Sequence, residues 1–203
     1  MAGYQAISVD GSRDARTLVL APLPELHLRL TDPEGRPIDP AAVQILIRRR
    51  DLAALGPPQT LRAPAALAPG RWEVALAPTA SCYAARFEGG RGGRPDGWNQ
   101  IELMAGAPAE VAFVLSPRPA AVHGAVADRG RAVASVPVYL SAEGLEPRMT
   151  RTDTAGQYEF YGLAPGVYRV LASFDAVSPE AGGPVELREG QDQAFDLSLY
   201  RAQ

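Results

Sequence analysis

The sequence predicts an all-β protein made of two copies of one small β-sandwich. Three observations predict this fold class: a repeated turn-and-strand segment, Gly and Pro scattered along the chain, and no helical spacing of apolar residues. The 203 residues include 20 Gly and 19 Pro, which is typical of many short strands joined by tight turns. A hydrophobic content of 46% supports packed cores rather than a disordered chain.

The repeat is clearest in a segment that begins with Leu-Ala-Pro-Gly. It covers residues 67–74 and again residues 163–170, an offset of 96 residues (163 − 67). In each copy a Pro-Gly turn opens a strand with alternating apolar residues. A small β-sandwich takes about 100 residues, so we expect two seven-stranded sandwiches, at residues 22–118 and 119–203.

The second sandwich can be divided into strands in order. We expect strands at 122–127, 136–140, 148–152, 158–161 and 166–174, and then a closing hairpin formed by 185–188 and 193–199. Asp153 and Gly156 suit the turn between the third and fourth strands, because Asp bonds its own downstream backbone and Gly accepts positive φ. Gly166 and its counterpart Gly70 each follow Pro in a turn that favours positive φ. Tyr168 is expected to pack as a structural corner.

The first sandwich repeats this plan but carries a longer connection, the loop 86–98. Such a length is uncommon in a compact domain and is usually functional or mobile. Aromatic and arginine side chains in and beside the loop are candidate ligand or partner contacts, through sugar stacking or a protein hot spot. The alternative is that they pin the loop to the sandwich. The candidates are Tyr83, Phe87, Arg91, Arg94 and Trp98.

Residues 1–21 are similar to the closing strands of both sandwiches and predict an extra N-terminal β-hairpin. Its apolar residues alternate with polar ones, as in a half-buried pair of strands; they are Ile7, Val9, Leu18 and Leu20. A lone hairpin is marginal in water. Either it ends a preceding module, or it adds to a sheet edge of another copy and drives self-assembly.

Four segments of the second sandwich together resemble the carboxypeptidase regulatory-like family, which is similar to transthyretin-like and Cna-B-type sandwiches. The segments are 122–126, 133–140, 152–160 and 163–168. The resemblance covers about residues 122–199 and is weaker over 24–115, which lack the Thr-Asp-x-x-Gly-x-Tyr segment. It implies an immunoglobulin-like or transthyretin-like accessory module of secreted, periplasmic or surface proteins, without catalytic residues. Some Cna-B-type modules carry a Lys-to-Asn or Lys-to-Asp isopeptide bond, which this chain cannot form because it has no Lys.

Several function classes find little support. His27 and His123, the only histidines, occupy equivalent strands of separate sandwiches, which indicates structural roles rather than catalysis or a metal site. No nucleotide-binding or nucleophile motif occurs, so we expect no cofactor. The net charge of −3 does not favour nucleic acid, and no apolar run predicts membrane insertion. Cys82 is the single cysteine, and we expect it to be buried.

These observations favour a non-catalytic structural or adhesive segment of an extracellular, cell-surface or periplasmic bacterial protein. Its expected partners are copies of itself or other modules of the same parent chain. A carbohydrate-binding module that uses the aromatic loop is the main alternative, and an accessory domain of a secreted enzyme is a third.

Overall fold

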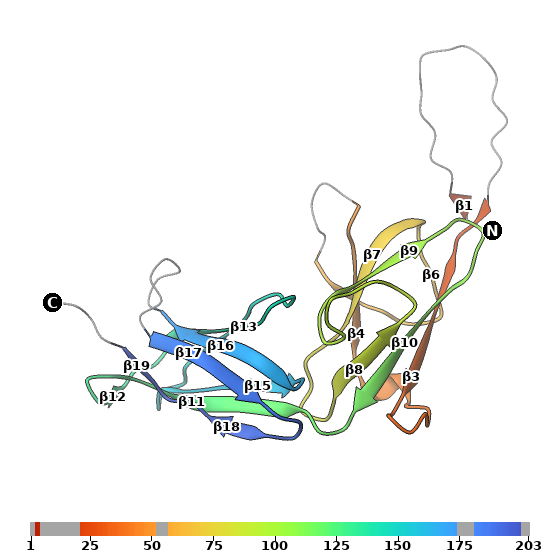
Figure 1. Ribbon diagram of the computed structural model, residues 1–203. Helices are drawn as coiled ribbons and strands as arrows, with labels where there is room; N and C mark the ends of the chain where they lie inside the picture. Colours follow the sequence, from red (N-terminus) through yellow and green to blue (C-terminus); the bar gives the residue numbers. More distant parts are fainter. Residues whose placement is uncertain (1–2, 5–20, 52–56, 174–180, 200–203) are drawn as a thin grey trace, which may run out of the picture.

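A computed structural model describes residues 3–4, 21–51, 57–173 and 181–199. All the regular secondary structure of the described residues is β-strand, except for one 3-10 turn at Pro40–Ala42. They form two pairs of packed sheets, here called the first sandwich (residues 21–116) and the second sandwich (residues 120–199) (Figure 1). The all-β fold class predicted from the sequence is confirmed. Ile7, Val9, Leu18 and Leu20 lie outside the described residues.

The first sandwich packs two four-stranded sheets against each other. One has the strand order β6-β3-β10-β8, and the other has the order β5-β4-β7-β9. Strand β10 lies parallel to β3, and the other neighbours are antiparallel. The strands are β3 (Glu25–Thr31), β4 (Ile45–Arg49), β5 (Gln59–Thr60), β6 (Ala65–Ala66), β7 (Gly70–Leu76), β8 (Tyr83–Glu88), β9 (Asn99–Leu103) and β10 (Ala109–Ser116).

The second sandwich repeats this order. One sheet has the order β14-β13-β16-β17; in the other, β11 lies between β15 and the split strand β18–β19, with the short β12 beside its end. Strands β18 and β19 run parallel to β11, as β10 does to β3. The strands are β11 (Ala120–Asp128), β12 (Arg131–Ala132), β13 (Pro137–Ser141), β14 (Arg148–Arg151), β15 (Gln157–Leu163), β16 (Gly166–Ala172), β17 (Ala181–Leu187), β18 (Asp192–Ala194) and β19 (Leu197–Leu199).

Strand β8 of the first sandwich has no counterpart among the described strands of the second. Residues 86–88, predicted to begin a long loop, instead form the end of β8 and pair with β10. Phe87 stabilises this edge because its ring lies 4.9 Å from the ring of buried Phe113. The connection from β8 to β9 is therefore shorter than predicted and spans residues 89–98.

The closing hairpin predicted for the second sandwich is wrong. Strand β17 pairs with β16, whereas β18 and β19 pair with β11 in the opposite sheet. The turn at Glu189–Gln191 therefore crosses between the sheets rather than joining two paired strands. At the N-terminal end, β1 (Gly3–Tyr4) pairs with β2 (Ala21–Pro22), at the end of the first sandwich farthest from the second (Figure 1).

Each sandwich closes over its own hydrophobic core. Alternate residues of each strand point inward, as in Asn99–Leu103, where buried and exposed side chains alternate. Phe113 is fully buried in the first core, and Val122 and Val170 are fully buried in the second. Cys82 is buried at the edge of the first core, and burial raises the pKa of its thiol.

Gly156 and Gly130 make a matched pair for testing the turns of the second sandwich. Both have φ of +76°, which strains any residue with a Cβ. A Cβ on Gly156 would lie 2.9 Å from the Val126 carbonyl oxygen, whereas nothing lies within 4 Å of one on Gly130. We expect Gly130→Ala to cost about 1 kcal/mol and Gly156→Ala about 2–4 kcal/mol in unfolding free energy.

Chemical denaturation of the two variants would measure this difference. Equal losses would mean that the turn at Asp153–Gly156 is not packed against β11 as described.

Candidate functional site at the junction of the sandwiches

In both sandwiches an aromatic residue two positions after the Gly of the Pro-Gly turn bonds back to that turn; we call this arrangement the aromatic corner, formed by Trp72 in the first sandwich and Tyr168 in the second. The Trp72 indole Nε1 donates to the Ala68 carbonyl at 2.9 Å, and the Tyr168 hydroxyl donates to the Ala164 carbonyl at 2.8 Å. Each aromatic thus bonds the carbonyl four residues earlier and folds its turn back on itself. The glycines of these turns, Gly70 and Gly166, have φ of +136° and +153°.

The corner of the second sandwich is covered by an arginine from the first. Arg94 Nη2 donates to the Tyr168 hydroxyl oxygen at 3.0 Å, and its guanidinium carbon lies 5.3 Å from the centre of that ring. Asp96 holds the guanidinium in place by accepting from Nε at 3.0 Å and Nη2 at 2.9 Å. The hydrogen bond to Asp96 raises the pKa of Arg94, and burial raises the pKa of Tyr168 to about 12.

The corner of the first sandwich is covered from within. Arg49 lies 5.6 Å from the Trp72 ring and donates to Asp51 through Nε at 2.6 Å and Nη2 at 3.2 Å. The pairing of Arg49 with Asp51 reproduces that of Arg94 with Asp96, since each arginine bonds the carboxylate two residues later. The corner of the first sandwich is thus covered by an arginine of the same sandwich, whereas the corner of the second is covered by an arginine from the other side of the junction.

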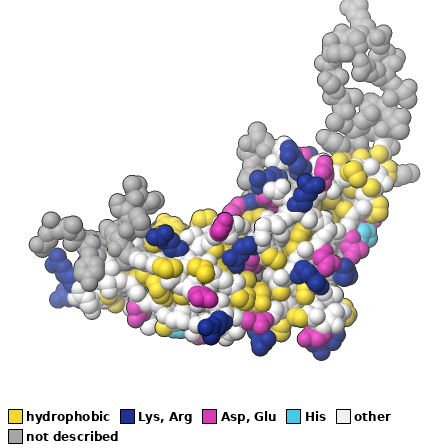
Figure 2. All heavy atoms as spheres, in the orientation of Figure 1, with side chains coloured by type: hydrophobic (Ala, Val, Ile, Leu, Met, Phe, Trp, Pro, Cys, Tyr) yellow, Lys and Arg dark blue, Asp and Glu magenta, His cyan; other side chains and the backbone are white. Residues whose placement is uncertain are grey.

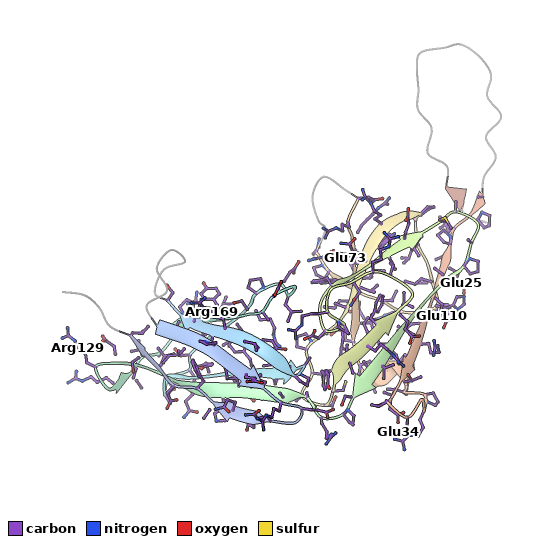
Figure 3. All side chains as sticks on the ribbon, in the orientation of Figure 1. Glu25, Glu34, Glu73, Glu110, Arg129 and Arg169 are labelled. Atoms are coloured by element: carbon purple, nitrogen blue, oxygen red, sulfur yellow. The ribbon has the colours of Figure 1, made fainter. Side chains whose placement is uncertain are left out.

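A second contact across the junction centres on Glu146, in the turn between β13 and β14. Its Oε2 accepts from Trp98 Nε1 at 3.1 Å and from Arg48 Nη1 at 3.2 Å. Arg48 also stacks 4.0 Å from the centre of the Trp98 ring and donates from Nε to buried Glu73 at 2.8 Å. Glu73 belongs to β7 of the first sandwich (Figure 3). The hydrogen bond from Arg48 lowers the pKa of Glu146.

A third contact centres on Glu189, in the turn that crosses between the sheets of the second sandwich. Its carboxylate accepts from the Ser116 hydroxyl at 2.6 Å, from Arg118 Nη2 at 2.7 Å and from the Tyr83 hydroxyl at 3.3 Å. The hydrogen bond from Ser116 is the main cause that lowers the pKa of Glu189. All three contacts place turns of the second sandwich against the end of the first.

The backbones also approach closely at the junction. A Cβ on Gly162 would lie 2.6 Å from the carbonyl oxygen of Thr79, and one on Gly97 would lie 2.9 Å from Leu145 Cδ2. At Gly162 the contact is with backbone, so this position requires glycine for the sandwiches to come together as they do, whereas at Gly97 the Leu145 side chain can shift. A cavity of about 60 Å³ remains between them, lined by residues from both sides.

The structure brings four of the five predicted loop residues into intramolecular contacts. Tyr83, Arg94 and Trp98 lie at the junction, and Phe87 packs on the first core. Arg91 is exposed and pairs through its backbone with Gln100. Because the polar atoms of Tyr83 and Trp98 and one face of the Trp98 ring have partners, these contacts favour the packing alternative over a sugar-stacking surface.

Sequence reasoning missed the partners that the second sandwich contributes, Glu146 and Glu189. Both lie in exposed turns and belong to no motif. The only available signal was the position of Glu189 directly before the Gly190 turn, which has a counterpart at Gly106 in the first sandwich.

Elsewhere, the histidines lie apart, each beside one carboxylate. His27 lies 3.6 Å from Glu25, and Glu25 is on the side of the first sandwich that faces away from the second (Figure 3). His123 lies 2.8 Å from Asp192. Within the described ranges, no three His, Cys, Asp or Glu side chains are grouped as a metal ion would require. No helix in the described part of the chain has the length and apolar character to cross a membrane.

Basic and acidic side chains are interspersed over both sandwiches on the face drawn in Figure 2. Such mixing leaves no extended basic surface on that face of the kind that proteins use to follow a nucleic-acid backbone.

Several solved structures show a distant likeness to the chain. The streptococcal ancillary pilin is 11% identical, with 95% of this chain and 68% of that chain covered and a TM-score of 0.35. The minor pilin GBS52 of Streptococcus agalactiae is 10% identical, with 89% and 98% covered and a TM-score of 0.35. The TIE protein of Bacillus anthracis is 12% identical with a TM-score of 0.34; 88% of this chain is covered, which spans only 34% of that protein. Likeness at this level says nothing about function.

No curated protein matches the chain. The second sandwich, in contrast, has a recognisable family. Its motifs predicted a resemblance over about residues 122–199, and that prediction is confirmed: residues 121–200 match the family model of the carboxypeptidase regulatory-like domain.

Proposed function

We propose that this chain is a non-catalytic structural segment of a secreted or cell-surface protein, in which two β-sandwiches are held at a fixed angle. The observation that carries this proposal is the Arg94–Asp96 pair, which covers the aromatic corner of the second sandwich from the first. Two independent modules on a flexible linker would not need a contact of this kind. A rigid segment, which spaces or presents neighbouring parts of a parent protein, would need it to hold its two sandwiches in one arrangement.

The connection between the sandwiches supports a fixed angle. Strand β10 ends at Ser116 and β11 begins at Ala120, so only Pro117, Arg118 and Pro119 lie between them. Two of these three residues are proline, whose ring fixes φ and stiffens a linker. Arg118 is itself tied to Glu189 of the second sandwich at 2.7 Å.

The expected partners are proteins, namely other modules of the parent chain or further copies of this one. An adhesive or accessory role beside a separate enzyme fits the same rigid segment. Carbohydrate binding by the loop is the weaker alternative, because its aromatic side chains already have partners within the chain.

The pair Arg94→Ala and Arg91→Ala tests the fixed angle. Arg94 contacts the second sandwich, whereas Arg91 belongs to the same loop and is exposed. We expect Arg94→Ala to lower the unfolding free energy by about 1–3 kcal/mol, because it leaves Asp96 and Tyr168 without their donor in a half-buried site. Small-angle X-ray scattering should then require several arrangements of the sandwiches instead of one.

Arg91→Ala should leave both the scattering and the stability unchanged. If the wild-type protein itself scatters as an ensemble of angles, the proposal fails whatever the variants do.

Acid should loosen the junction. The pKa values of Glu146 and Glu189 lie below their ordinary value of 4.5, so both carboxylates stabilise the folded junction above that pH. This stabilisation is lost as the pH falls through the lowered values. We expect scattering between about pH 7 and about pH 3 to change from one arrangement to several while the strand content, followed by circular dichroism, persists.

The double variant Glu146→Gln and Glu189→Gln lacks both titrating carboxylates, so its scattering curve at about pH 3 should be the same as its curve at about pH 7. Glu143→Gln, in the same exposed turn as Glu146, is the matched control and should behave as the wild type. An acid response that survives in the double variant would assign the effect to other groups.

Self-assembly through residues 1–21 stays a separate prediction. Deleting them should reduce any oligomer to a folded monomer, as measured by light scattering. An oligomer whose mass distribution does not change on deletion would exclude this role for the segment.

A further inference from the structure

The outer edge of β14 in the second sandwich, here called the β14 edge, has backbone groups without partners. Thr152, directly after β14, donates its N–H to the Val136 carbonyl at 3.0 Å, so the backbone of Thr152 faces β13. Backbone groups alternate between the two sides of a strand, so Met149 and Arg151 point their N–H and C=O groups away from β13. Within the described ranges of the chain, no hydrogen bond satisfies these outward groups.

Other sheet edges of the described chain are blocked by the devices that β proteins commonly use. Strand β17 contains Pro184, which has no N–H, and the backbone of Arg91 bonds Gln100 on the edge of β9. Strand β8 is bulged, β18–β19 is interrupted, and β5, β6 and β12 have only two residues each. On β15, the Tyr161 carbonyl accepts from Arg148. The β14 edge has no proline, no bulge and no described segment that covers it.

A groove of about 470 Å³ runs beside this edge, between β14 and β15. Its volume is within the range of about 300–1,000 Å³ found for small-ligand sites, so it has room for side chains of an added strand. Its lining consists of His123, Thr150, Arg151, Asp153, Gln157, Tyr158 and Glu159.

The charges that line the groove are negative in sum. Arg151 contributes one positive charge, and Asp153 and Glu159 contribute two negative ones (1 − 2 = −1). Asp153 accepts from the backbone of its own turn, and His123 pairs with Asp192 at 2.8 Å. Glu159 is exposed, and in the described part of the chain its carboxylate has no hydrogen bond or ion pair. The groove therefore favours a cation, and Glu159 is the group to bind it.

We propose that the β14 edge accepts an extended segment of a partner protein, which adds as a further strand and places a Lys or Arg side chain beside Glu159. The main chain of that segment pairs with Met149 and Arg151, and every second side chain points into the groove. The β14 edge of a second copy does not fit this description, because Arg148 and Arg151 would bring like charges together across the new pair.

This inference deepens the proposed structural role and rests on its expectation of protein partners. The edge and the groove lie wholly within the second sandwich. They do not require a fixed angle to the first sandwich, so the two proposals can be tested separately.

Amide hydrogen exchange of the wild-type protein tests whether the edge is open. We expect the amides of Met149 and Arg151 to exchange at least about 100-fold faster than that of Thr150, which faces β13. Slow exchange at both outward amides in a monomer would overturn the proposal. Slow exchange in an oligomer would also overturn it and would assign the edge to a second copy of the chain.

The probe for the partner is a short peptide in which lysine and valine alternate, compared with one in which glutamate and valine alternate. We expect the lysine peptide to slow exchange at Met149 and Arg151 and to bind with a Kd of about 0.1–1 mM, measured by NMR titration. Its binding should be at least about fivefold tighter than that of the glutamate peptide.

The variant Glu159→Lys should reverse this preference, because it replaces the free carboxylate with a cation. Glu186→Lys is the matched control: Glu186 is exposed on β17 of the same sandwich, outside the groove lining, so its variant should keep the wild-type preference. Equal binding of the two peptides to the wild type, or a preference that persists in Glu159→Lys, would contradict the proposed role of the groove.

The variant Met149→Pro tests the main-chain pairing. It removes an N–H that points away from β13, so the bonds within the sheet remain. We expect the lysine peptide to bind at least about tenfold more weakly to it, whereas Met149→Val, which keeps the N–H, should bind as the wild type does. Circular dichroism checks that Met149→Pro keeps its strand content, and the Glu159→Lys comparison decides the proposal if it does not.

The fixed junction and the β14 edge fail with different results. If small-angle scattering of the wild type shows one arrangement and neither peptide binds, the edge proposal is wrong and the junction stands. If scattering shows an ensemble while the lysine peptide protects Met149 and Arg151, the fixed junction is wrong and the edge proposal stands.

Discussion

The contact on which the arrangement of the sandwiches depends is the one between Arg94 and Tyr168. Tyr168 is buried at the end of the second sandwich, and its hydroxyl group can donate only one hydrogen bond. It donates to the Ala164 carbonyl, so its oxygen remains to be satisfied as an acceptor. The Arg94 guanidinium supplies that donor and covers the ring at the same time. A water molecule could supply the donor but could not cover the ring.

The two sandwiches carry similar aromatic corners, but only the corner of the second sandwich is part of the junction. Both corners need a cation over the aromatic ring and a carboxylate beside the turn. In the first sandwich β4 continues into Arg49 and Asp51, which meet that need locally. In the second, the arginine and the carboxylate come from the loop that follows β8, a strand without a counterpart among the described strands of the second sandwich. Strand β8 therefore both widens its sheet and leads into the loop that reaches the second sandwich.

The sequence predicts much of the fold because the repeat is local and periodic. The offset of 96 residues relates β7 to β16 correctly, since Gly70 and Gly166 both begin their strands. Strand β8 was missed because Arg86 and Glu88 interrupt its apolar pattern and glycines follow at once. The crossing at Glu189 was taken for a hairpin, because strand periodicity does not tell which sheet a strand joins.

The junction itself could not be predicted, because the residues it joins are far apart in the chain. Arg94 and Tyr168 are 74 residues apart, and Trp98 and Glu146 are 48 apart. No local pattern marks an exposed glutamate in a turn as the acceptor for a tryptophan on another module. The loop residues were identified from their types, and the choice between binding and packing needed the three-dimensional contacts.

The absence of lysine gives these contacts their character. All 20 basic residues are arginine, so no Lys-derived isopeptide bond can stiffen either sandwich. A planar guanidinium can bond a carboxylate through two nitrogens and still stack on a ring, whereas an ammonium group offers only a point charge. Arg94 uses both properties at Asp96 and Tyr168, and Arg48 does so between Glu146 and Trp98. Replacing either by lysine would keep the charge and lose the geometry, so the proposed fixed angle depends on the shape of the cation as much as on its sign.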